Sequence, residues 1–240
     1  ETNEAYKGAY LDNTLSGSFT PGSIFKIVTA AAAMEQYPDT WSSLTYDCQG
    51  AIEMAGSDIT CLGGHAHGTQ DMAAALGNSC NVYFAQLAND LGAEALQKKA
   101  EEMGFNTQLE FGTIPIAEST IDLTDVNANQ LGWAGVGQHT VLTNPYHMMV
   151  LMGAIANGGS YVEPRLTQDA NLLGSLSSGG QALVTSTEAP NLKTLLRGNV
   201  ENYYGDSLSP SGWKVSATTG PGDVGEETGP TSRLLRLCDS

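Results

Sequence analysis

Basic residues are scarce in this chain of 240 residues: Lys and Arg number 10 against 26 Asp and Glu, which leaves a formal net charge of −16. Nucleic-acid binding depends on a positive surface, and an acidic chain is also repelled by anionic lipid headgroups. The composition therefore excludes a nucleic-acid-binding function and disfavours direct binding to a membrane surface. It identifies no partner, since net charge also serves solubility.

Long apolar runs are also absent, because none approaches the ~18 residues that a membrane-spanning helix needs. No signal peptide is visible, and the first residue is Glu1. Hydrophobic residues still make up 41% of the chain, and its 28 glycines indicate many turns around a substantial core. No internal repeat or linker divides the chain, so we expect one domain over residues 1–240, cut from a longer protein.

Cysteine is sparse as well, and the spacings of the four residues match no common zinc pattern: Cys48, Cys61, Cys80 and Cys238. Cys48 and Cys61 flank a hairpin-like segment with MAGSD as its turn, so a disulfide and a pair of buried thiols both remain open. We interpret Cys80 as a small buried residue. His65 and His67 are spaced like metal ligands, but no third ligand cluster lies near them in sequence. The prediction is therefore two loop histidines and no metal site.

The periodicity of apolar residues predicts a helix-rich, strand-poor α+β fold. Helices are expected over 22–36, 69–78, 81–92, 93–104, 144–157 and within 189–205. A hairpin is expected within 44–62, extended segments at 160–168 and 212–220, and loops at 63–68 and at the glycine-rich stretch 132–138.

Ser23 and Lys26 lie three positions apart in TPGSIFK, at the start of the first expected helix. That spacing places both side chains on one helix face. The free amide groups at a helix N-terminus can hold an oxyanion, and a desolvated lysine can take the serine proton. The same pair also occurs by chance in ordinary helices, so it needs partners elsewhere in the chain.

Further motifs provide candidate partners. Ser79 and Asn81 form an S-x-N triplet in GNSCNVYF, between two expected helices, although a helix cap explains a lone triplet equally well. Thr218, Thr219 and Gly220 end an alternating, strand-like segment. Gln138 ends the glycine-rich stretch GWAGVGQ, and we expect it to lie near the cleft.

An S-x-x-K, an S-x-N and a K-T-G motif in this order are typical of penicillin-binding proteins and serine β-lactamases. With its flanks PGSIFKIVTAAAAME and HGTQDMAAALGNSCNVYFAQLANDLG, the chain resembles the transpeptidase domain of a penicillin-binding protein over about residues 1–235. The resemblance implies an antiparallel sheet with a helical subdomain, from which terminal sheet strands are missing here.

The resemblance also implies a mechanism. Ser23 attacks the penultimate D-alanine of a peptidoglycan stem peptide, Lys26 acts as the base, and Ser79 and Asn81 assist proton transfer and positioning. Thr218, Thr219, Gly220, Pro221 and Gln138 are expected to bind substrate. A β-lactam would acylate Ser23, and no metal or organic cofactor is needed. The implied location is the extracytoplasmic face of a bacterial plasma membrane, with a membrane anchor in an N-terminal region that this chain lacks.

The third motif departs from the family pattern at two positions. Thr218 stands where the family has lysine, and Pro221 stands where the family uses a backbone N–H as the second oxyanion donor. Proline has no N–H, and loss of one oxyanion donor costs about 10²–10³ in rate. We therefore expect slow acylation or none. A catalytically silent sensor or scaffold module and a serine β-lactamase are the alternative interpretations.

Overall fold

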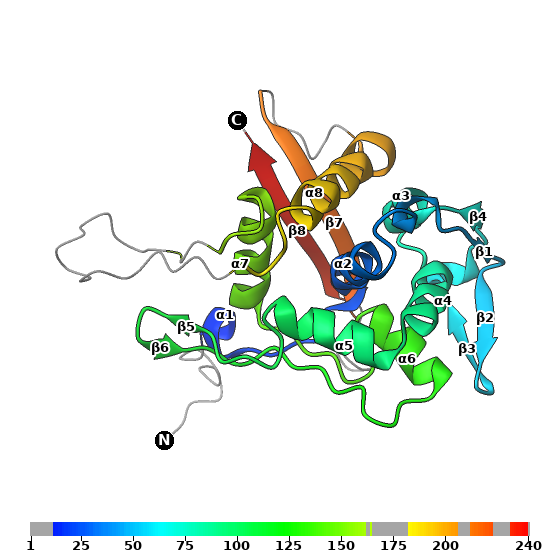
Figure 1. Cartoon of the computed structure of the whole chain (residues 1–240), viewed down its shortest axis with the longest axis horizontal. Helices are drawn as coiled ribbons and strands as arrows, with labels where there is room; N and C mark the ends of the chain where they lie inside the picture. The colour runs from blue at the N-terminus through cyan, green and yellow to red at the C-terminus, as the bar shows by residue number, and fades with distance from the viewer. Residues whose placement is uncertain (1–11, 162–163, 165–181, 206–211, 223–230, 240) are drawn as a thin grey trace, which may run out of the picture.

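The computed structural model describes residues 12–161, 164, 182–205, 212–222 and 231–239. In these ranges, helices surround one central helix and short strands lie around them, which confirms the expected α+β class (Figure 1). The helices are α1 (Asn13–Ser16), α2 (Lys26–Gln36), α3 (Met72–Gly77), α4 (Asn81–Leu91), α5 (Ala93–Glu102), α6 (Ala128–Gly135), α7 (Pro145–Ala156) and α8 (Glu188–Asn199). The strands are β1 (Tyr46–Cys48), β2 (Ala51–Met54), β3 (Ser57–Thr60), β4 (Gly68–Gln70), β5 (Glu110–Phe111), β6 (Ile114–Pro115), β7 (Lys214–Gly222) and β8 (Thr231–Asp239).

Helix α2 forms the centre of the core because its residues are small or apolar over most of its length. Residues 26–34 are all buried, and they include a run of four alanines. The small side chains let α4, α5 and α8 pack against α2 from different sides. A 3-10 turn, Gly22–Phe25, leads into α2. The helix predicted over 22–36 is therefore confirmed, with a tighter first turn.

The predictions for α4, α5 and α7 agree with the structure to within two residues at each end. Local chemistry explains the agreement for α7. Asn144 caps its N-terminus through its side chain, and Pro145 occupies the first turn, where no backbone donor is needed. The last predicted helix is also present as α8, followed by a π-helical turn, Val200–Tyr204.

The glycine-rich stretch 132–138 was predicted to be a loop, and that prediction is wrong for its first half. Residues 132–135 form the C-terminal part of α6. A β-carbon on Gly132 would clash with Ile59 and Ala85, and one on Gly135 would clash with Ala88. The two glycines therefore allow α6 to pack closely on α4, and they do not mark a break in the helix.

The hairpin predicted within 44–62 is present as the antiparallel pair β2–β3, with Ala55 and Gly56 at positive φ in its turn. Strand β1 instead pairs with β4, which lies beyond the loop that follows β3. Residues 69 and 70, predicted to begin a helix, belong to β4, and α3 begins only at Met72 after the capping side chain of Asp71. Propensity could not show this, because the pairing partner of β4 is distant in sequence.

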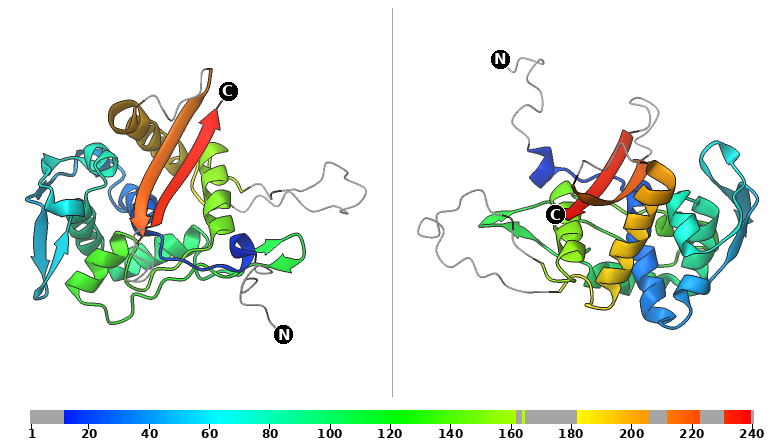
Figure 2. Two further views of the ribbon diagram at one scale, coloured as in Figure 1. Left: turned by 180° about the vertical axis from the view of Figure 1, so that it is seen from behind. Right: turned by 90° about the horizontal axis from the view of Figure 1, so that it is seen from above.

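The longest described sheet is the antiparallel pair β7–β8, in which Lys214 pairs with Asp239 and Gly222 with Thr231. It lies along α7 and α8 in both views of Figure 2, and its β7 strand contacts the 3-10 turn before α2. The extended segment predicted at 212–220 is thereby confirmed. The one predicted at 160–168 falls largely outside the described residues.

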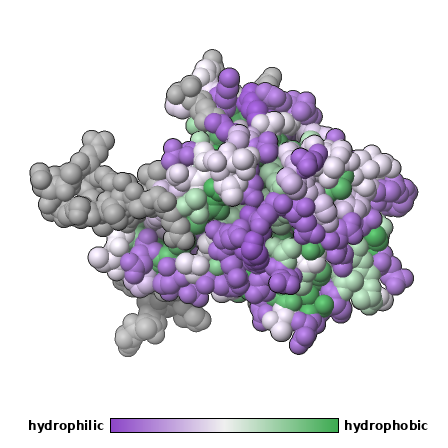
Figure 3. All heavy atoms as spheres, in the orientation of Figure 1, coloured by the Kyte–Doolittle hydropathy of each residue, from purple (hydrophilic) through white to green (hydrophobic). Residues whose placement is uncertain are grey.

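Hydrophilic residues cover much of the face drawn in Figure 3, in keeping with the acidic composition. Among the described residues, no helix has both the length and the apolar character needed to cross a membrane.

Candidate active site

Ser23 and Lys26 lie side by side at the start of the central helix. The Lys26 ammonium nitrogen lies 2.9 Å from Ser23 Oγ. Ser23 is 6% exposed, whereas Lys26 is fully buried. The tight 3-10 turn aims both side chains in one direction, because residues three apart nearly eclipse in that geometry. The two residues therefore form a contacting pair, as the sequence predicted.

Lys26 also contacts the S-x-N turn. Its Nζ lies 2.7 Å from the carbonyl oxygen of Ser79, 3.1 Å from Ser79 Oγ and 2.8 Å from Asn81 Oδ1. Asn81 in turn donates from Nδ2 to the carbonyl oxygen of Thr60, 2.8 Å away, which fixes the orientation of its amide. The structure thus brings all four predicted catalytic residues together around one buried amine.

Burial is the main influence on the charge of Lys26. Desolvation lowers its pKa from 10.5 to about 7, and the electrostatic influence of the nearby Cys80 and Cys61 only partly opposes this shift. A substantial fraction of Lys26 is therefore neutral near pH 7. A neutral amine can accept a proton from a hydroxyl group that contacts it.

Ser79 holds a backbone conformation that is rare for a residue with a side chain, with φ at +51°. Left-handed backbone costs a non-glycine residue roughly 1–2 kcal/mol. The conformation turns both the hydroxyl and the carbonyl of Ser79 toward Lys26. Such strain persists only where surrounding contacts hold it.

Strand β7 forms a further wall of the site. Gly220 lies so close to the nucleophile turn that a β-carbon there would be 2.9 Å from the backbone nitrogen of Ser23. Thr219 is held by Tyr204, whose hydroxyl lies 3.4 Å from both its backbone nitrogen and its Oγ1. Pro221 follows Gly220 within the same strand, so the backbone at that position offers no N–H beside Ser23.

A cavity of about 500 Å³ opens over these groups. Its wall includes Ser23, Ser79, Asn81, Thr219 and Gln138. Gln138 reaches the wall because the preceding Gly137, at φ +86°, lies against the backbone of Gly22, whose N–H donates to the Gly137 carbonyl at 2.9 Å. The predicted placement of Gln138 at a cleft is confirmed.

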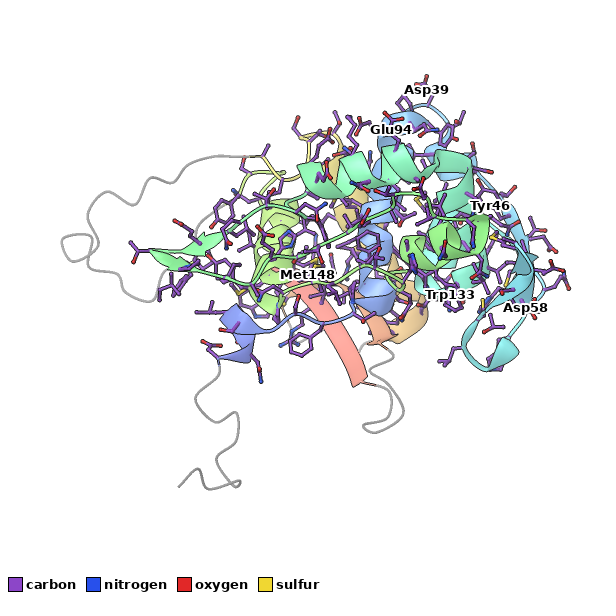
Figure 4. All side chains as sticks on the ribbon, turned by 90° about the horizontal axis from the view of Figure 1, so that it is seen from below. Asp39, Tyr46, Asp58, Glu94, Trp133 and Met148 are labelled. Carbon is purple, nitrogen blue, oxygen red and sulfur yellow. The ribbon has the colours of Figure 1, made fainter. Side chains whose placement is uncertain are left out.

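Trp133 also lines this cavity, which the sequence did not indicate. In Figure 4 it lies on α6, toward the end of the molecule that carries Tyr46 and Asp58, whereas Met148 lies on α7. A larger cavity of about 810 Å³, bounded by Lys99 and Glu188, lies elsewhere. It contains none of the predicted site residues.

Thr218 is a predicted substrate-binding residue whose side chain the structure places away from the cavity. Its side chain is 1% exposed, and among the described residues it is not part of the cavity wall. The alternation of β7 explains this, since neighbouring side chains in a strand point to opposite faces. Thr219 faces the cavity, and Thr218 faces the interior.

The sequence shows no third ligand cluster near His65 and His67, but the structure brings three cysteines beside His67 in space. Cys48, Cys61, Cys80 and His67 bring their ligand atoms within 4.8 Å of one another. All three cysteines are free and buried, which favours thiols over the Cys48–Cys61 disulfide. Four separate segments supply these residues, so no local spacing reveals the cluster. The one hint in the sequence is a cysteine inside the S-x-N triplet.

A serine hydroxyl in contact with a buried amine of lowered pKa, beside a second serine and an amide, is an arrangement suited to acyl transfer. These features define the class as that of serine acyltransferases. The chain belongs to the family described as penicillin binding protein transpeptidase domain, whose model matches residues 1–234. The resemblance inferred from the motifs is thereby confirmed.

Individual relatives agree with this membership. The chain is 30% identical over 181 residues to the peptidoglycan D,D-transpeptidase PbpA of Mycobacterium tuberculosis, covering 73% of this chain and 35% of that protein. It is similar to the structure of penicillin-binding protein A from M. tuberculosis as a ceftriaxone acyl-enzyme complex, with a TM-score of 0.83, 25% identity, and coverage of 95% of this chain and 54% of that one.

A second solved structure is the D,D-transpeptidase domain of a peptidoglycan glycosyltransferase from Eggerthella lenta, with a TM-score of 0.84, 26% identity, and coverage of 98% of this chain and 61% of that one. This chain spans about a third of the length of the curated relatives it matches.

Proposed function

We propose that the chain is the acyl-transfer domain of a peptidoglycan D,D-transpeptidase, with Ser23 as the nucleophile and Lys26 as its base. The single observation that carries this proposal is the position of the Lys26 amine. It is fully buried and lies 2.9 Å from Ser23 Oγ and 3.1 Å from Ser79 Oγ. One group can therefore exchange protons with both hydroxyls.

The proposed reaction runs through an ester on Ser23. Ser23 Oγ attacks the carbonyl carbon of the penultimate D-alanine of a stem peptide, and its proton passes to the neutral Lys26 amine. The bond to the terminal D-alanine breaks, and that leaving amine takes a proton through the Ser79 hydroxyl. An amine of a neighbouring stem then attacks the ester and releases Ser23. A β-lactam enters the same first step and leaves Ser23 acylated.

The cavity wall supplies the remaining roles in this proposal. Asn81, held by Lys26 and Thr60, orients the substrate amide. Thr219 and Gln138 contact the bound peptide from the cavity wall, and Gly220 allows β7 to lie beside the acylated serine. We assign Thr218 no contact with substrate, because its side chain is buried in the interior.

Location and attachment follow from the substrate. Peptidoglycan is built outside the cytoplasm, and the curated relatives are named for that activity. We therefore place the domain at the extracytoplasmic face of a bacterial plasma membrane, attached through a membrane anchor in a region that precedes this chain.

Pro221 supports a second candidate, a silent module that keeps the fold without the activity. The oxyanion formed during acylation would receive an N–H from Ser23 but none from position 221. Loss of one such donor slows reactions by about 10²–10³. Our hypothesis is that acylation is slow, and a penicillin acylation rate at the level normal for the family would contradict it.

Labelling with a fluorescent penicillin separates the candidates. A stable adduct on Ser23, located by peptide mass spectrometry and lost in Ser23→Ala, supports the transpeptidase. Rapid turnover of the penicillin means a β-lactamase, and no adduct after long incubation means a silent module. Ser57→Ala is the matched control, because Ser57 is exposed on β3, outside the cavity wall.

A further inference from the structure

Three thiols and one imidazole converge beside the active site, outside the groups that acyl transfer uses. We propose that Cys48, Cys61, Cys80 and His67 bind one zinc ion, and that this ion holds the S-x-N turn in place. The proposal rests on the geometry of the four side chains and not on the proposed function. It would hold equally for a silent module.

The distances within the cluster match a zinc tetrahedron. With Zn–S bonds of about 2.3 Å and Zn–N bonds of about 2.0–2.1 Å, the edges of a tetrahedron are about 3.8 Å between sulfurs and about 3.6 Å between sulfur and nitrogen. The observed separations are 3.6 Å for Cys48 Sγ to Cys61 Sγ, 3.7 Å for Cys61 Sγ to Cys80 Sγ, and 3.4 Å for Cys48 Sγ to His67 Nδ1. All four ligand atoms lie within 4.8 Å of one another.

The donor set also fits zinc. Three thiolates and one imidazole form a complete four-coordinate shell of the structural type, which leaves no open position for a substrate. Soft thiolate ligands exclude magnesium and calcium, which prefer oxygen. The Cys80 sulfur also accepts the backbone N–H of Tyr83 at 3.3 Å, a hydrogen bond that stabilises a thiolate.

The alternatives account for less of the cluster. A disulfide between Cys48 and Cys61 would involve only two of the four groups. It would not explain why the Cys80 thiol and the His67 imidazole lie against these two sulfurs. Packing as small apolar residues explains buried cysteines, but it does not explain why the polar Nδ1 of His67 faces the Cys48 sulfur. A metal ion uses all four groups at once.

The ligands come from four segments of the chain, two of which are already joined by the pairing of β1 with β4. Cys48 ends β1, Cys61 follows β3, His67 precedes β4, and Cys80 caps the N-terminus of α4. One ion would therefore join both small sheets to the start of α4. Short two-stranded sheets are weakly stable alone. A shared ion would stabilise them by linking each sheet to the start of α4.

Cys80 connects this site to the active site, because it lies between Ser79 and Asn81 in the chain. Ser79 keeps its strained left-handed backbone, and Asn81 bonds the carbonyl of Thr60, the residue before Cys61. A zinc ion that fixes Cys61 and Cys80 would hold Ser79 and Asn81 at their present distances from the Lys26 amine. We assign the ion a positioning role, with no contact to substrate.

Metal analysis of the purified wild-type chain tests the proposal directly. We expect about one zinc per chain after dialysis against a weak chelator, as a four-ligand site retains its ion. Replacement by cobalt should give the intense visible bands of tetrahedral thiolate coordination. Absence of zinc together with no cobalt spectrum, a different bound metal such as iron or copper, or a Cys48–Cys61 disulfide in the folded chain would each overturn it.

Variants localise the ion. Cys48→Ser and His67→Ala should lose it, whereas Cys238→Ser, at an exposed cysteine on β8, should keep it. Unchanged zinc in both ligand variants would contradict the assignment. If either variant fails to fold, the cobalt spectrum of the wild-type chain still shows whether thiolates bind the ion. In an acylating chain, chelation should also slow labelling of Ser23 by about 10²-fold, the loss expected for a misplacement of about 1 Å.

Discussion

A β-carbon on Gly220 would lie 2.9 Å from the backbone nitrogen of Ser23 and 3.0 Å from its Cβ. Strand β7 and the nucleophile turn, nearly two hundred residues apart in the chain, are thus in direct backbone contact. The contact is what places the segment after Gly220 beside the serine. The residue at position 221 therefore determines whether an oxyanion at Ser23 finds a second backbone N–H donor.

Gly220→Ala should slow acylation of Ser23 by tenfold or more, since either β7 or the nucleophile turn must move. Overpacking of this kind also costs about 1–3 kcal/mol in stability. Labelling rates and thermal unfolding measured together check both effects. A variant labelled as fast as its parent would show that β7 moves without disturbing the site.

Pro221→Ala should increase the acylation rate by about 10²–10³, because alanine restores a backbone N–H at the position of the missing oxyanion donor. The measurement is the second-order rate constant for a fluorescent penicillin. Pro115→Ala, at an exposed proline on β6, serves as the matched control and should change nothing. Equal rates for Pro221→Ala and the wild type would contradict the proposed handicap. If acylation of the wild-type chain is too slow to measure a further loss, the effect of Gly220→Ala should be measured in the faster Pro221→Ala chain.

The acylation rate should rise as pH increases through about 7. Burial lowers the pKa of Lys26 to about 7, so the amine is protonated and unable to accept the Ser23 proton at lower pH. Above that pH the rate should level off. Lys26→Arg should be inactive throughout, because the guanidinium stays charged. A rate independent of pH between 5.5 and 8.5, roughly one and a half units either side, would exclude Lys26 as the base.

Two adjacent lysines on α5 provide a matched test of buried charge. Lys99 is 3% exposed and pairs with the buried Glu188 at 2.9 Å, and it also contacts Glu35 and Glu102. Lys98 pairs with the same Glu35 and Glu102, but it is 59% exposed.

Lys99→Met should therefore cost about 3–5 kcal/mol, because Glu188 is left buried without its partner. Lys98→Met should cost much less, as expected for an exposed pair. Chemical denaturation at pH 7 measures both values. Similar losses for the two variants would mean that Glu188 reaches water or another cation.

Two helical glycines separate close packing from helix propensity. Gly135→Ala places a methyl group against Ala88 of α4 and should destabilise the chain by about 1–3 kcal/mol. Gly153→Ala on α7 meets no atom within 4 Å and should stabilise it by about 0.5–1 kcal/mol. The shift in the unfolding midpoint shows whether each variant is stabilised or destabilised. Stabilisation by Gly135→Ala would contradict close α4–α6 packing as the reason for that glycine.

The sequence by itself determined the features that depend on neighbouring residues. The S-x-x-K spacing placed Ser23 and Lys26 on one face of a turn, the Asn144–Pro145 pair began α7, and alternation near residue 218 produced a strand. Proline at 221 removes a backbone donor in any fold. These features follow from covalent geometry and local hydrogen bonding, so they can be predicted without knowing the tertiary structure.

Only the tertiary structure decided what depends on distant segments. In the sequence, Gly132 and Gly135 suggest a loop. The structure shows that they are helical, and that close packing of α6 leaves no room for side chains there. Thr218 and Thr219 are equivalent in the motif until the faces of β7 separate them. Cys48, Cys61, His67 and Cys80 have no shared spacing, because a ligand set is defined by distances in space, and long-range packing brings these four side chains together next to Ser79 and Asn81.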